Sequence, residues 1–264
     1  MKTNNLSVGI FDSGVGGTSI WKEIKALLPN ENTIYLSDSK NAPYGDKSKQ
    51  EIIDLSIKNT EFLLQQNCKL IIVACNTATT NAIKVLREKY SIPFIGIEPA
   101  IKPASLKTKT NIIGILATKG TLSSELFEKT SSEIRQRISI KERIGKGLVE
   151  LIEKGEINSS EMKKLLISHI EPMLQAKVDC LVLGCTHYPY LIPQIREIVG
   201  DKVQIIDSGE AVAKQTKTIL EKYGLFNNNI ERGKHHFYTN KNKKILEMLL
   251  PKDIKLIKIE EKDF

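Results

Sequence analysis

The chain alternates short apolar runs with amphipathic stretches along most of its length, and this alternation restricts the fold more than any other feature. The apolar runs lie at 6–11, 33–37, 70–74, 94–97, 111–116, 180–184 and 203–207, and the amphipathic stretches at 18–28, 47–66, 77–90, 123–132, 159–176, 189–199 and 209–223. Strands that alternate with helices in this way form parallel sheets flanked by helices. The runs LIIVA and CLVLG are apolar throughout, as expected of strands buried on both faces. We therefore predict an α/β fold with parallel sheets.

The segment 98–110, EPAIKPASLKTKT, interrupts the alternation because it is rich in Pro, Lys and Thr. Further along, VQIIDSGEA at 203–211 contains an Asp-Ser-Gly turn that resembles FDSG at 11–14. A chain of 264 residues is long enough for two compact units. We therefore predict a discontinuous first α/β domain, 1–97 plus 207–264, with a second α/β domain, 98–206, inserted into it.

The net charge of +8 is the property that would favour a nucleic-acid partner. The lysines, however, are spread along the chain, and dense basic stretches such as KHHFYTNKNKK occur only near the C-terminus. We interpret the charge as a solvated lysine-rich surface and expect no nucleic-acid partner. No apolar run reaches the length of about 18 residues typical of a membrane span, and the N-terminus lacks the regions of a signal peptide. We therefore expect a cytoplasmic protein without a membrane partner.

Polar clusters follow five of the predicted strands. They are FDSGVGG at 11–17, DSKNAPYG at 38–45, CNT at 75–77, ATKGT at 117–121 and CTH at 185–187. Ligands of open α/β sheets bind at the carboxyl ends of strands, so we expect the site there. The glycines of FDSGVGG form neither a dinucleotide fingerprint nor a Walker A motif, because position 19 is serine and no Gly-Lys-Ser/Thr follows. Taken alone, this cluster is equally consistent with a tight turn between a strand and a helix.

The four cysteines form no C-x-x-C pair, and the four histidines complete no recognisable zinc pattern, so we expect free thiols and no metal. We interpret Cys68 and Cys180 as small buried hydrophobic residues. Cys75 and Cys185 differ, because each stands where a predicted strand ends and a helix is expected to begin. The positive end of a helix dipole there favours a thiolate. His187 also lies two residues beyond Cys185.

One such cysteine would suggest a covalent nucleophile. Two in similar settings on different domains suggest partners that face each other across a cleft. Inversion of a stereocentre requires such a pair, because one group removes a proton from one face while the other delivers a proton to the opposite face. The sequence therefore predicts acid–base chemistry by Cys75 and Cys185.

Beyond these features, the sequence resembles the glutamate racemases of the aspartate/glutamate racemase superfamily. The matching stretches are IFDSGVGG (10–17), APYG (42–45), ACNTAT (74–79), GIEPA (96–100), LATKGT (116–121), GLVELIEKG (147–155) and LGCTHYPYL (183–191). The resemblance implies two α/β domains related by pseudo-two-fold symmetry, with the active site between them. It also implies cofactor-independent racemisation of glutamate, which supplies D-glutamate for peptidoglycan synthesis, by a homodimer that uses neither metal nor nucleotide.

The resemblance further implies roles for individual residues. Cys75 would take the proton from D-glutamate and Cys185 from L-glutamate. Asp12 would assist Cys75, and His187, helped by Glu150, would assist Cys185. The residues implied to hold the substrate are Asp12, Ser13, Tyr44, Gly45, Asn76, Thr77, Thr118, Thr121, Thr186 and His187. The sequence departs from the family just before Glu150, where Gly145-Lys146 replaces the common Cys-Pro.

The residues themselves leave several alternatives open. Asp12 could cap the following helix, His187 could be a buried structural histidine, Glu150 could be a surface carboxylate, and Tyr44 could simply pack. For the whole protein, one rival is a racemase that prefers aspartate or accepts both acids. Another is a decarboxylase or isomerase with a single catalytic cysteine. A third, from a different class, is a basic binding protein whose cysteines are structural.

Overall fold

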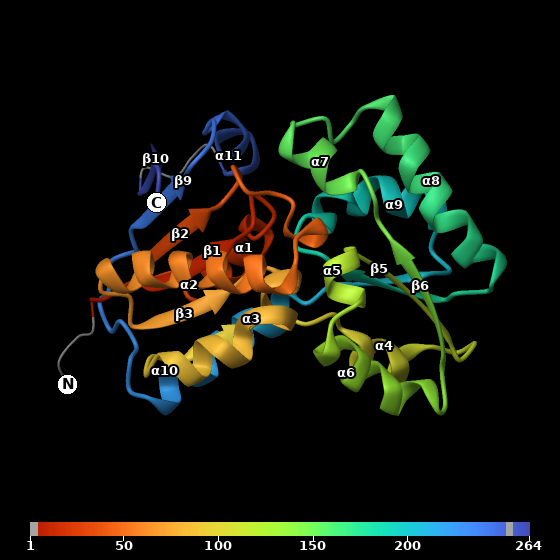
Figure 1. Cartoon of the computed structure of the whole chain (residues 1–264), viewed down its shortest axis with the longest axis horizontal. Coiled ribbons are helices and arrows are strands. Elements are labelled where there is room, and N and C mark those ends of the chain that lie inside the picture. The colour runs from red at the N-terminus through yellow and green to blue at the C-terminus, as the bar shows by residue number, and fades with distance from the viewer. Residues whose placement is uncertain (1–4, 252–255) are drawn as a thin grey trace.

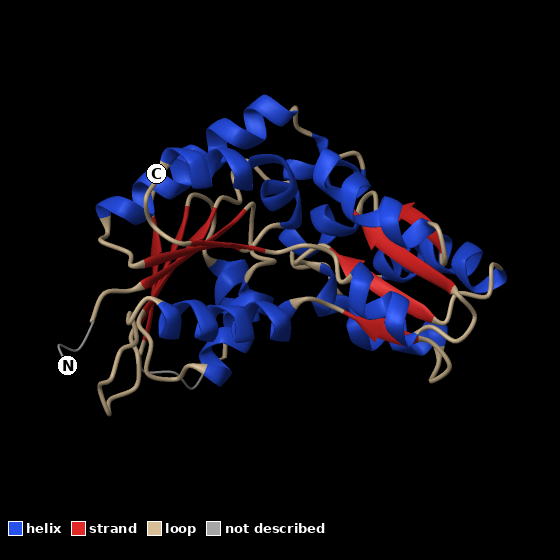
Figure 2. Cartoon of the chain, turned by 90° about the horizontal axis from the view of Figure 1, so that it is seen from below, coloured by secondary structure: helices blue, strands red, loops and turns tan. Residues whose placement is uncertain are grey.

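Two separate parallel β-sheets form the framework of the chain, and helices lie on both faces of each (Figures 1 and 2). The computed structural model describes residues 5–251 and 256–264. The first sheet has the order β10-β9-β2-β1-β3-β4, with β1 (Val8–Asp12), β2 (Thr33–Ser37), β3 (Leu70–Val73), β4 (Phe94–Gly96), β9 (His235–Thr239) and β10 (Ile257–Glu261). The second has the order β6-β5-β7-β8, with β5 (Ile112–Ala117), β6 (Ser139–Ile144), β7 (Cys180–Gly184) and β8 (Gln204–Ile206). The strand pairs are parallel, which confirms the predicted α/β class.

The helices connect these strands. The part of the chain before β4 and the part after β8 contain α1 (Thr18–Leu27), α2 (Lys49–Gln65), α3 (Asn76–Lys89), α10 (Gly209–Lys222) and α11 (Lys244–Leu249). The middle of the chain contains α4 (Ile101–Lys107), α5 (Lys119–Leu122), α6 (Glu125–Arg135), α7 (Leu148–Glu153), α8 (Ser160–Gln175) and α9 (Ile192–Val199). Two 3-10 turns, η1 (Tyr44–Asp46) and η2 (Tyr188–Leu191), follow β2 and β7.

The same connectivity occurs twice. The orders β2-β1-β3-β4 and β6-β5-β7-β8 both place the first strand of the set between the second and the third. In such sheets the crevice at the carboxyl ends of the first and third strands is where successive connections turn to opposite faces. The two crevices, beyond β1/β3 and beyond β5/β7, are therefore the positions where each sheet can present a ligand site.

The chain passes between the sheets after β4 and again after β8. The two passages are tied together, because the Ser208 hydroxyl donates a 2.6 Å hydrogen bond to the Glu98 carbonyl. Strands before residue 98 and after residue 206 belong to the first sheet, and those between belong to the second. The division into domains at 97/98 and 206/207 stays a prediction that this strand assignment favours.

Local sequence accounts for the elements that were predicted. All four residues of β3 are fully buried aliphatic side chains, as a central strand covered on both faces requires. Helix α2 begins with a capping box, in which Ser48 and Glu51 each accept a hydrogen bond from the other's backbone amide. The seven predicted strands are all present, with ends that differ from the prediction by at most two residues.

Several elements were missed. β6 is an edge strand with the largely exposed sequence SIKERI, so it carries no buried-strand pattern. β9 contains His235 and His236 from the basic stretch near the C-terminus, and β10 alternates charged with apolar residues. The segment 98–110 contains α4, which tolerates Pro103 because the proline lies in the first turn, where no intrahelical N–H partner is needed.

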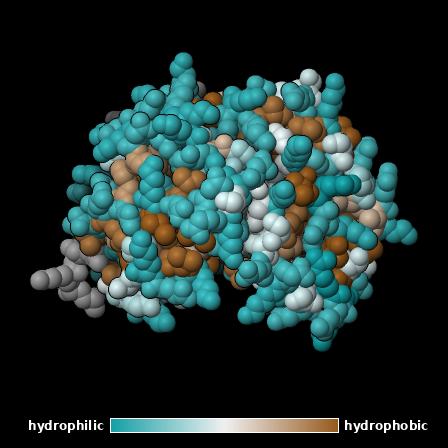
Figure 3. Space-filling view, viewed as in Figure 1, coloured by the Kyte–Doolittle hydropathy of each residue, from teal (hydrophilic) through white to brown (hydrophobic). Residues whose placement is uncertain are grey.

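Hydrophilic side chains cover much of the face seen in Figure 3, with smaller hydrophobic patches between them. This appearance fits a chain with 39 Lys and Arg residues among 264. Within the two described ranges, no helix combines the length and the apolar character needed to cross a membrane.

Candidate active site

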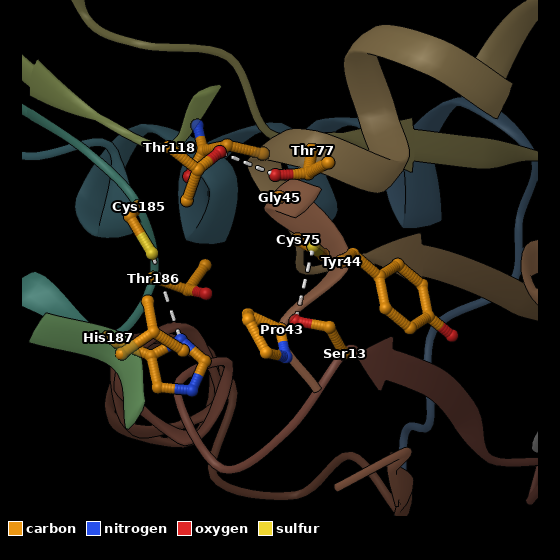
Figure 4. A pocket seen from close by; sticks show the side chains of 12 residues that line it. Ser13, Pro43, Tyr44, Gly45, Cys75, Thr77, Thr118, Cys185, Thr186 and His187 are labelled. Carbon is orange, nitrogen blue, oxygen red and sulfur yellow. Dashed lines mark hydrogen bonds between the residues drawn. The ribbon is translucent and has the colours of Figure 1, made fainter. Parts of the chain in front are cut away.

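A small pocket lies where loops of the two sheets meet, at the carboxyl ends of their strands (Figure 4). Its lining residues are Ser13, Pro43, Tyr44, Gly45, Cys75, Asn76, Thr77, Thr118, Val149, Cys185, Thr186 and His187. The segments after β1, β2 and β3 supply the lining from the first sheet, and those after β5, β6 and β7 supply it from the second. The predicted site residues thus come together, except that Asp12, Thr121 and Glu150 do not line this pocket. Pro43 and Val149 were not among the predictions, although Pro43 belongs to the quoted APYG stretch.

Cys75 lies at the end of β3 and caps the N-terminus of α3. Its sulfur accepts a 3.4 Å hydrogen bond from the Ala78 amide and donates one of 3.6 Å to the Ser13 hydroxyl. Burial, and secondarily the nearby Asp12 carboxylate, raise the pKa of the Cys75 thiol above its usual value, and the hydrogen bonds with Ala78 and Ser13 only partly offset this. Cys75 is therefore a thiol, able to give a proton.

Cys185 occupies a different local setting from the one predicted. No α-helix begins there, because the 3-10 turn η2 follows first and α9 starts only at Ile192. The expectation that a helix dipole acts on this sulfur is therefore wrong. The neighbouring charged group is instead the His187 imidazole, whose Nδ1 lies 3.7 Å from the Cys185 sulfur. Cys185 and Cys75 stand on opposite sides of the pocket, one from each sheet (Figure 4).

His187 is paired with Glu153. Its Nε2 lies 2.6 Å from Glu153 Oε1, and both side chains are nearly inaccessible to solvent. Burial by itself lowers the pKa of His187, but the hydrogen bonds and charges of Cys185 and Glu153 outweigh burial and hold that pKa well above its usual value. Burial likewise acts to raise the pKa of Glu153, yet hydrogen bonds, that of His187 first, bring it below the usual value. The pair is thus an imidazolium and a carboxylate.

The expected helper of His187, Glu150, does not contact it, so this prediction is corrected to Glu153. Both carboxylates lie on the short helix α7, three residues apart, and residues at this spacing share one side of a helix. Sequence spacing therefore could not separate them. In the folded chain Glu153 lies one turn nearer to His187, whereas Glu150 lines a neighbouring pocket with Lys119 and Lys146.

The glycines of FDSGVGG make room for this pair. A Cβ on Gly14 would lie 1.9 Å from Glu153 Oε1, and one on Gly16 would lie 2.2 Å from His187 Nδ1. Real atoms do not approach this closely, so a side chain at either position would push Glu153 or His187 out of its place. The Val15 amide then donates a 2.6 Å hydrogen bond to Glu153 Oε1. The motif is therefore a contact surface between sheets as well as a turn.

Asp12 is fully buried at the end of β1. Its Oδ2 accepts hydrogen bonds from the Gly14 and Gly17 amides, at 3.2 and 3.0 Å, and its Oδ1 accepts one from the Thr186 hydroxyl at 3.2 Å. Burial raises the pKa of Asp12 to about 6, although the His187 charge acts against it. Asp12 thus orders the turn before α1 without capping the helix, whose N-cap is Gly17 and has no side-chain cap, and it also connects to the second sheet beside Cys185.

Asn76 and the hydroxyls of Thr77 and Thr118 make one side of the pocket polar. The Thr77 hydroxyl lies 2.7 Å from that of Thr118 and 3.3 Å from that of Thr121, which joins the start of α3 to the loop after β5. Asn76 is buried, and neither atom of its side-chain amide has a hydrogen-bond partner within the described residues. Buried amides are rarely left unpaired, so a ligand in the pocket is the natural partner of Asn76.

Tyr44 lines the pocket, but its ring points away from the two cysteines (Figure 4). Its hydroxyl donates to the buried Asp38 carboxylate and accepts a 3.1 Å hydrogen bond from Asn59. The phenol therefore packs and anchors the loop, and it is the backbone of Tyr44 and Gly45 that can meet a ligand. Within the two described ranges, no group of three or more His, Cys, Asp and Glu side chains is placed to bind a metal ion.

The pocket is thus built from two cysteines on opposite walls, each with an acidic or cationic neighbour, in an α/β framework repeated twice. The model of the Asp/Glu/hydantoin racemase family matches residues 16–216, so the chain belongs to this family. The glutamate racemase of Ralstonia pickettii (strain 12J) is 46% identical over 218 residues, which are 83% of this chain and 77% of that protein.

Solved structures of glutamate racemases have the same fold as this chain. A glutamate racemase isoform from Bacillus anthracis superposes with a TM-score of 0.87 at 32% identity, covering 98% of both chains. The glutamate racemase of Francisella tularensis subsp. tularensis SCHU S4, solved in complex with D-glutamate, superposes with a TM-score of 0.83 at 28% identity, covering 97% of this chain and 98% of that one.

Proposed function

We propose that this chain interconverts L-glutamate and D-glutamate by a two-thiol mechanism that needs no added cofactor. The observation that carries the proposal is the placement of Cys75 and Cys185, from different sheets, on opposite sides of one pocket. A relative at 46% identity and similar structures at 28 and 32% identity are glutamate racemases, and one was solved with D-glutamate, which favours glutamate over aspartate as the substrate.

In the direction from L- to D-glutamate, the Cys185 thiolate removes the α-proton and the electron pair stays on the α-carbon. The Cys75 thiol then delivers its proton to the opposite face. The reaction leaves Cys185 as a thiol and Cys75 as a thiolate, which are the forms needed for the reverse direction. The raised pKa of Cys75 supports its role as the acid in the first direction. His187, 3.7 Å from the Cys185 sulfur, is placed to exchange a proton with it, and Glu153 holds the imidazolium.

Asp12 is the proposed partner of Cys75, because its charge acts on that thiol and its pKa lies near 6. The substrate's ammonium and carboxylates are proposed to bind the polar lining: Ser13, the backbone at Tyr44 and Gly45, Asn76, Thr77, Thr118, Thr186 and His187. Thr121 and Asp12 are proposed to support this lining from behind, through their hydrogen bonds to Thr77, Thr118 and Thr186. Hydrogen-bond donors directed at the α-carboxylate lower the energy of the carbanion that forms when the proton leaves. The unpaired amide of Asn76 is the strongest single candidate for such a contact.

The test is racemisation of L-glutamate in deuterated water, without cofactor, by the wild type, Cys75→Ser and Cys185→Ser. We expect D-glutamate labelled at the α-carbon from the wild type, and loss of most racemisation in each variant. Matched variants, Cys68→Ser and Cys180→Ser, replace buried thiols outside the pocket and should keep turnover. The proposal is wrong if the wild type turns over no glutamate, or if both pocket variants keep full activity. The same assay with aspartate tests the rival specificity.

We further propose that the product serves peptidoglycan synthesis and that the enzyme is a cytoplasmic homodimer. Both extensions rest on the likeness to glutamate racemases. Depletion of the protein in its own host should create a growth requirement for D-glutamate, and light scattering after gel filtration should give twice the chain mass. Growth without D-glutamate, or a monomer at working concentration, would contradict the respective extension.

A further inference from the structure

Glu153 accepts hydrogen bonds from residues of both halves of the chain, and its two carboxylate oxygens have different numbers of donors. Oε1 receives hydrogen bonds from the Val15 amide and from His187 Nε2, both at 2.6 Å. Oε2 receives a single one, from the Ser39 hydroxyl at 2.8 Å. Within residues 5–251 and 256–264, no other group hydrogen-bonds Oε2, so Ser39 is the single donor that holds this oxygen in place.

Ser39 is itself held by a hydrogen bond with Ser37, at the end of β2 in the first sheet. It is 4% exposed, and its hydroxyl lies 3.0 Å from that of the fully buried Ser37. Ser37 is the last residue of β2, in register with Asp12 on β1 and with Thr239 on β9. Because the Ser39 proton goes to Glu153, the Ser37 hydroxyl donates to Ser39. Two hydroxyls therefore form a short chain from a central strand to the carboxylate.

We propose that Ser39 is a positioning residue of the reaction: it orients Glu153, and through Glu153 it orients His187 beside Cys185. The inference rests on the proposed function, since it names a further residue of the same site. Ser39 touches neither the pocket nor the cysteines, so it acts only through the carboxylate.

The arrangement also links the two halves of the chain. Ser39 and Val15 follow strands of the first sheet, whereas Glu153 and His187 follow strands of the second. The carboxylate thus obtains its full set of hydrogen bonds only when the loops of both sheets are in contact. Loss of the Ser39 donor would leave Oε2 buried without a partner, and only the two hydrogen bonds on Oε1 would then hold the carboxylate against His187.

The test compares Ser39→Ala with the wild type. Loss of a hydrogen bond to a charged group should lower kcat/KM about ten-fold, equally in both directions because the two enantiomers have equal free energy in solution. Ser39→Thr, which keeps the hydroxyl, should restore most of the activity. Ser56→Ala is the matched control, because Ser56 is also fully buried and its hydroxyl donates to the backbone of α2, away from the pocket. It should leave kcat/KM within about two-fold of wild type.

Two readouts separate positioning from mere packing. In a Glu153→Gln background, Ser39→Ala should lower kcat/KM little further, because the effects of substitutions in residues that act as a unit do not add. By NMR, the His187 ring, assigned with His187→Asn, should lose its proton at lower pH in Ser39→Ala than in wild type. The inference is overturned if Ser39→Ala keeps the wild-type kcat/KM, or if Ser39→Ala lowers kcat/KM by the same factor in the Glu153→Gln background as in the wild type. It is also overturned if the His187 ring loses its proton at the same pH in Ser39→Ala as in the wild type. Absence of glutamate turnover by the wild type would instead overturn the proposed function, and the His187 titration would still decide the role of Ser39.

Discussion

Replacement of Glu153 by Gln, compared with the same replacement at Glu150, tests the corrected partner of His187 directly. Glu153 and His187 form a pair with side chains 8 and 2% exposed, so removal of the negative charge leaves a buried imidazolium without its counter-ion. Breaking one side of a buried ion pair costs about 3 to 5 kcal/mol. We therefore expect the free energy of unfolding of Glu153→Gln to fall by about 3 kcal/mol near pH 6, and the pKa of His187 to fall.

The pH dependence of this loss follows from the two pKa shifts. The folded-state pKa of Glu153 is below its usual 4.5, so its contribution is present above pH 4.5 and is lost as the pH falls through the folded value. The folded-state pKa of His187 is above its usual 6.5, so its contribution is present below pH 6.5 and is lost as the pH rises through the folded value. The stability difference between wild type and Glu153→Gln should therefore be largest between pH 4.5 and 6.5, as measured by urea unfolding at several pH values.

Activity should separate the two carboxylates as well. Glu153→Gln removes the carboxylate that holds His187 beside Cys185. Loss of a correctly placed acid–base group typically lowers the rate by a factor of about 100 or more, so kcat/KM of Glu153→Gln should fall by about that factor. Glu150→Gln should stay within about two-fold of wild type and show no stability peak, because Glu150 makes no contact with His187. If Glu150→Gln is the damaging variant, or if the two behave alike, the assignment of Glu153 is refuted.

Three further predictions follow from particular contacts. Gly16→Ala would place a methyl group 2.2 Å from His187 Nδ1, so we expect a loss of about 100-fold in kcat with an unchanged circular dichroism spectrum; near-normal turnover would contradict this. Lys69→Met should lower the free energy of unfolding by about 3 kcal/mol, because Lys69 forms a 2.6 Å ion pair with Glu31 in which both side chains are almost fully buried; a midpoint in urea that does not move would count against it. Since burial raises the pKa of Asp12 to about 6, kcat/KM should decline as the pH falls below about 6, and Asp12→Asn should remove that limb of the profile; a flat wild-type profile from pH 5 to 7 would exclude the assignment.

Local pattern was enough to predict the framework. Apolar runs such as that of β3 must be buried on both faces, and the amphipathic stretches between them must cover those faces, whatever the rest of the chain does. A site at the carboxyl ends of the strands follows from the geometry of parallel sheets, which is why Cys75, Thr118 and Cys185 were placed correctly in one pocket. The edge strand β6 was not predicted, because its largely exposed sequence carries no pattern of burial.

What the tertiary structure decided is how segments far apart in the sequence meet. Glu150 and Glu153 are three residues apart, a spacing that places both on the same side of a helix. Only the packing of α7 against the loop after β1 makes Glu153 the partner of His187. The glycines at 14 and 16 looked like a turn, because the residues that need their space lie about 140 to 170 positions further on. The Tyr44 ring turns into the core because Asp38 and Asn59 offer it partners there. Helical and strand periodicities act over a few neighbouring residues, whereas hydrogen bonds and steric contacts of a site act over a few ångströms in space; the first can be read along the chain, and the second exist only once it is folded.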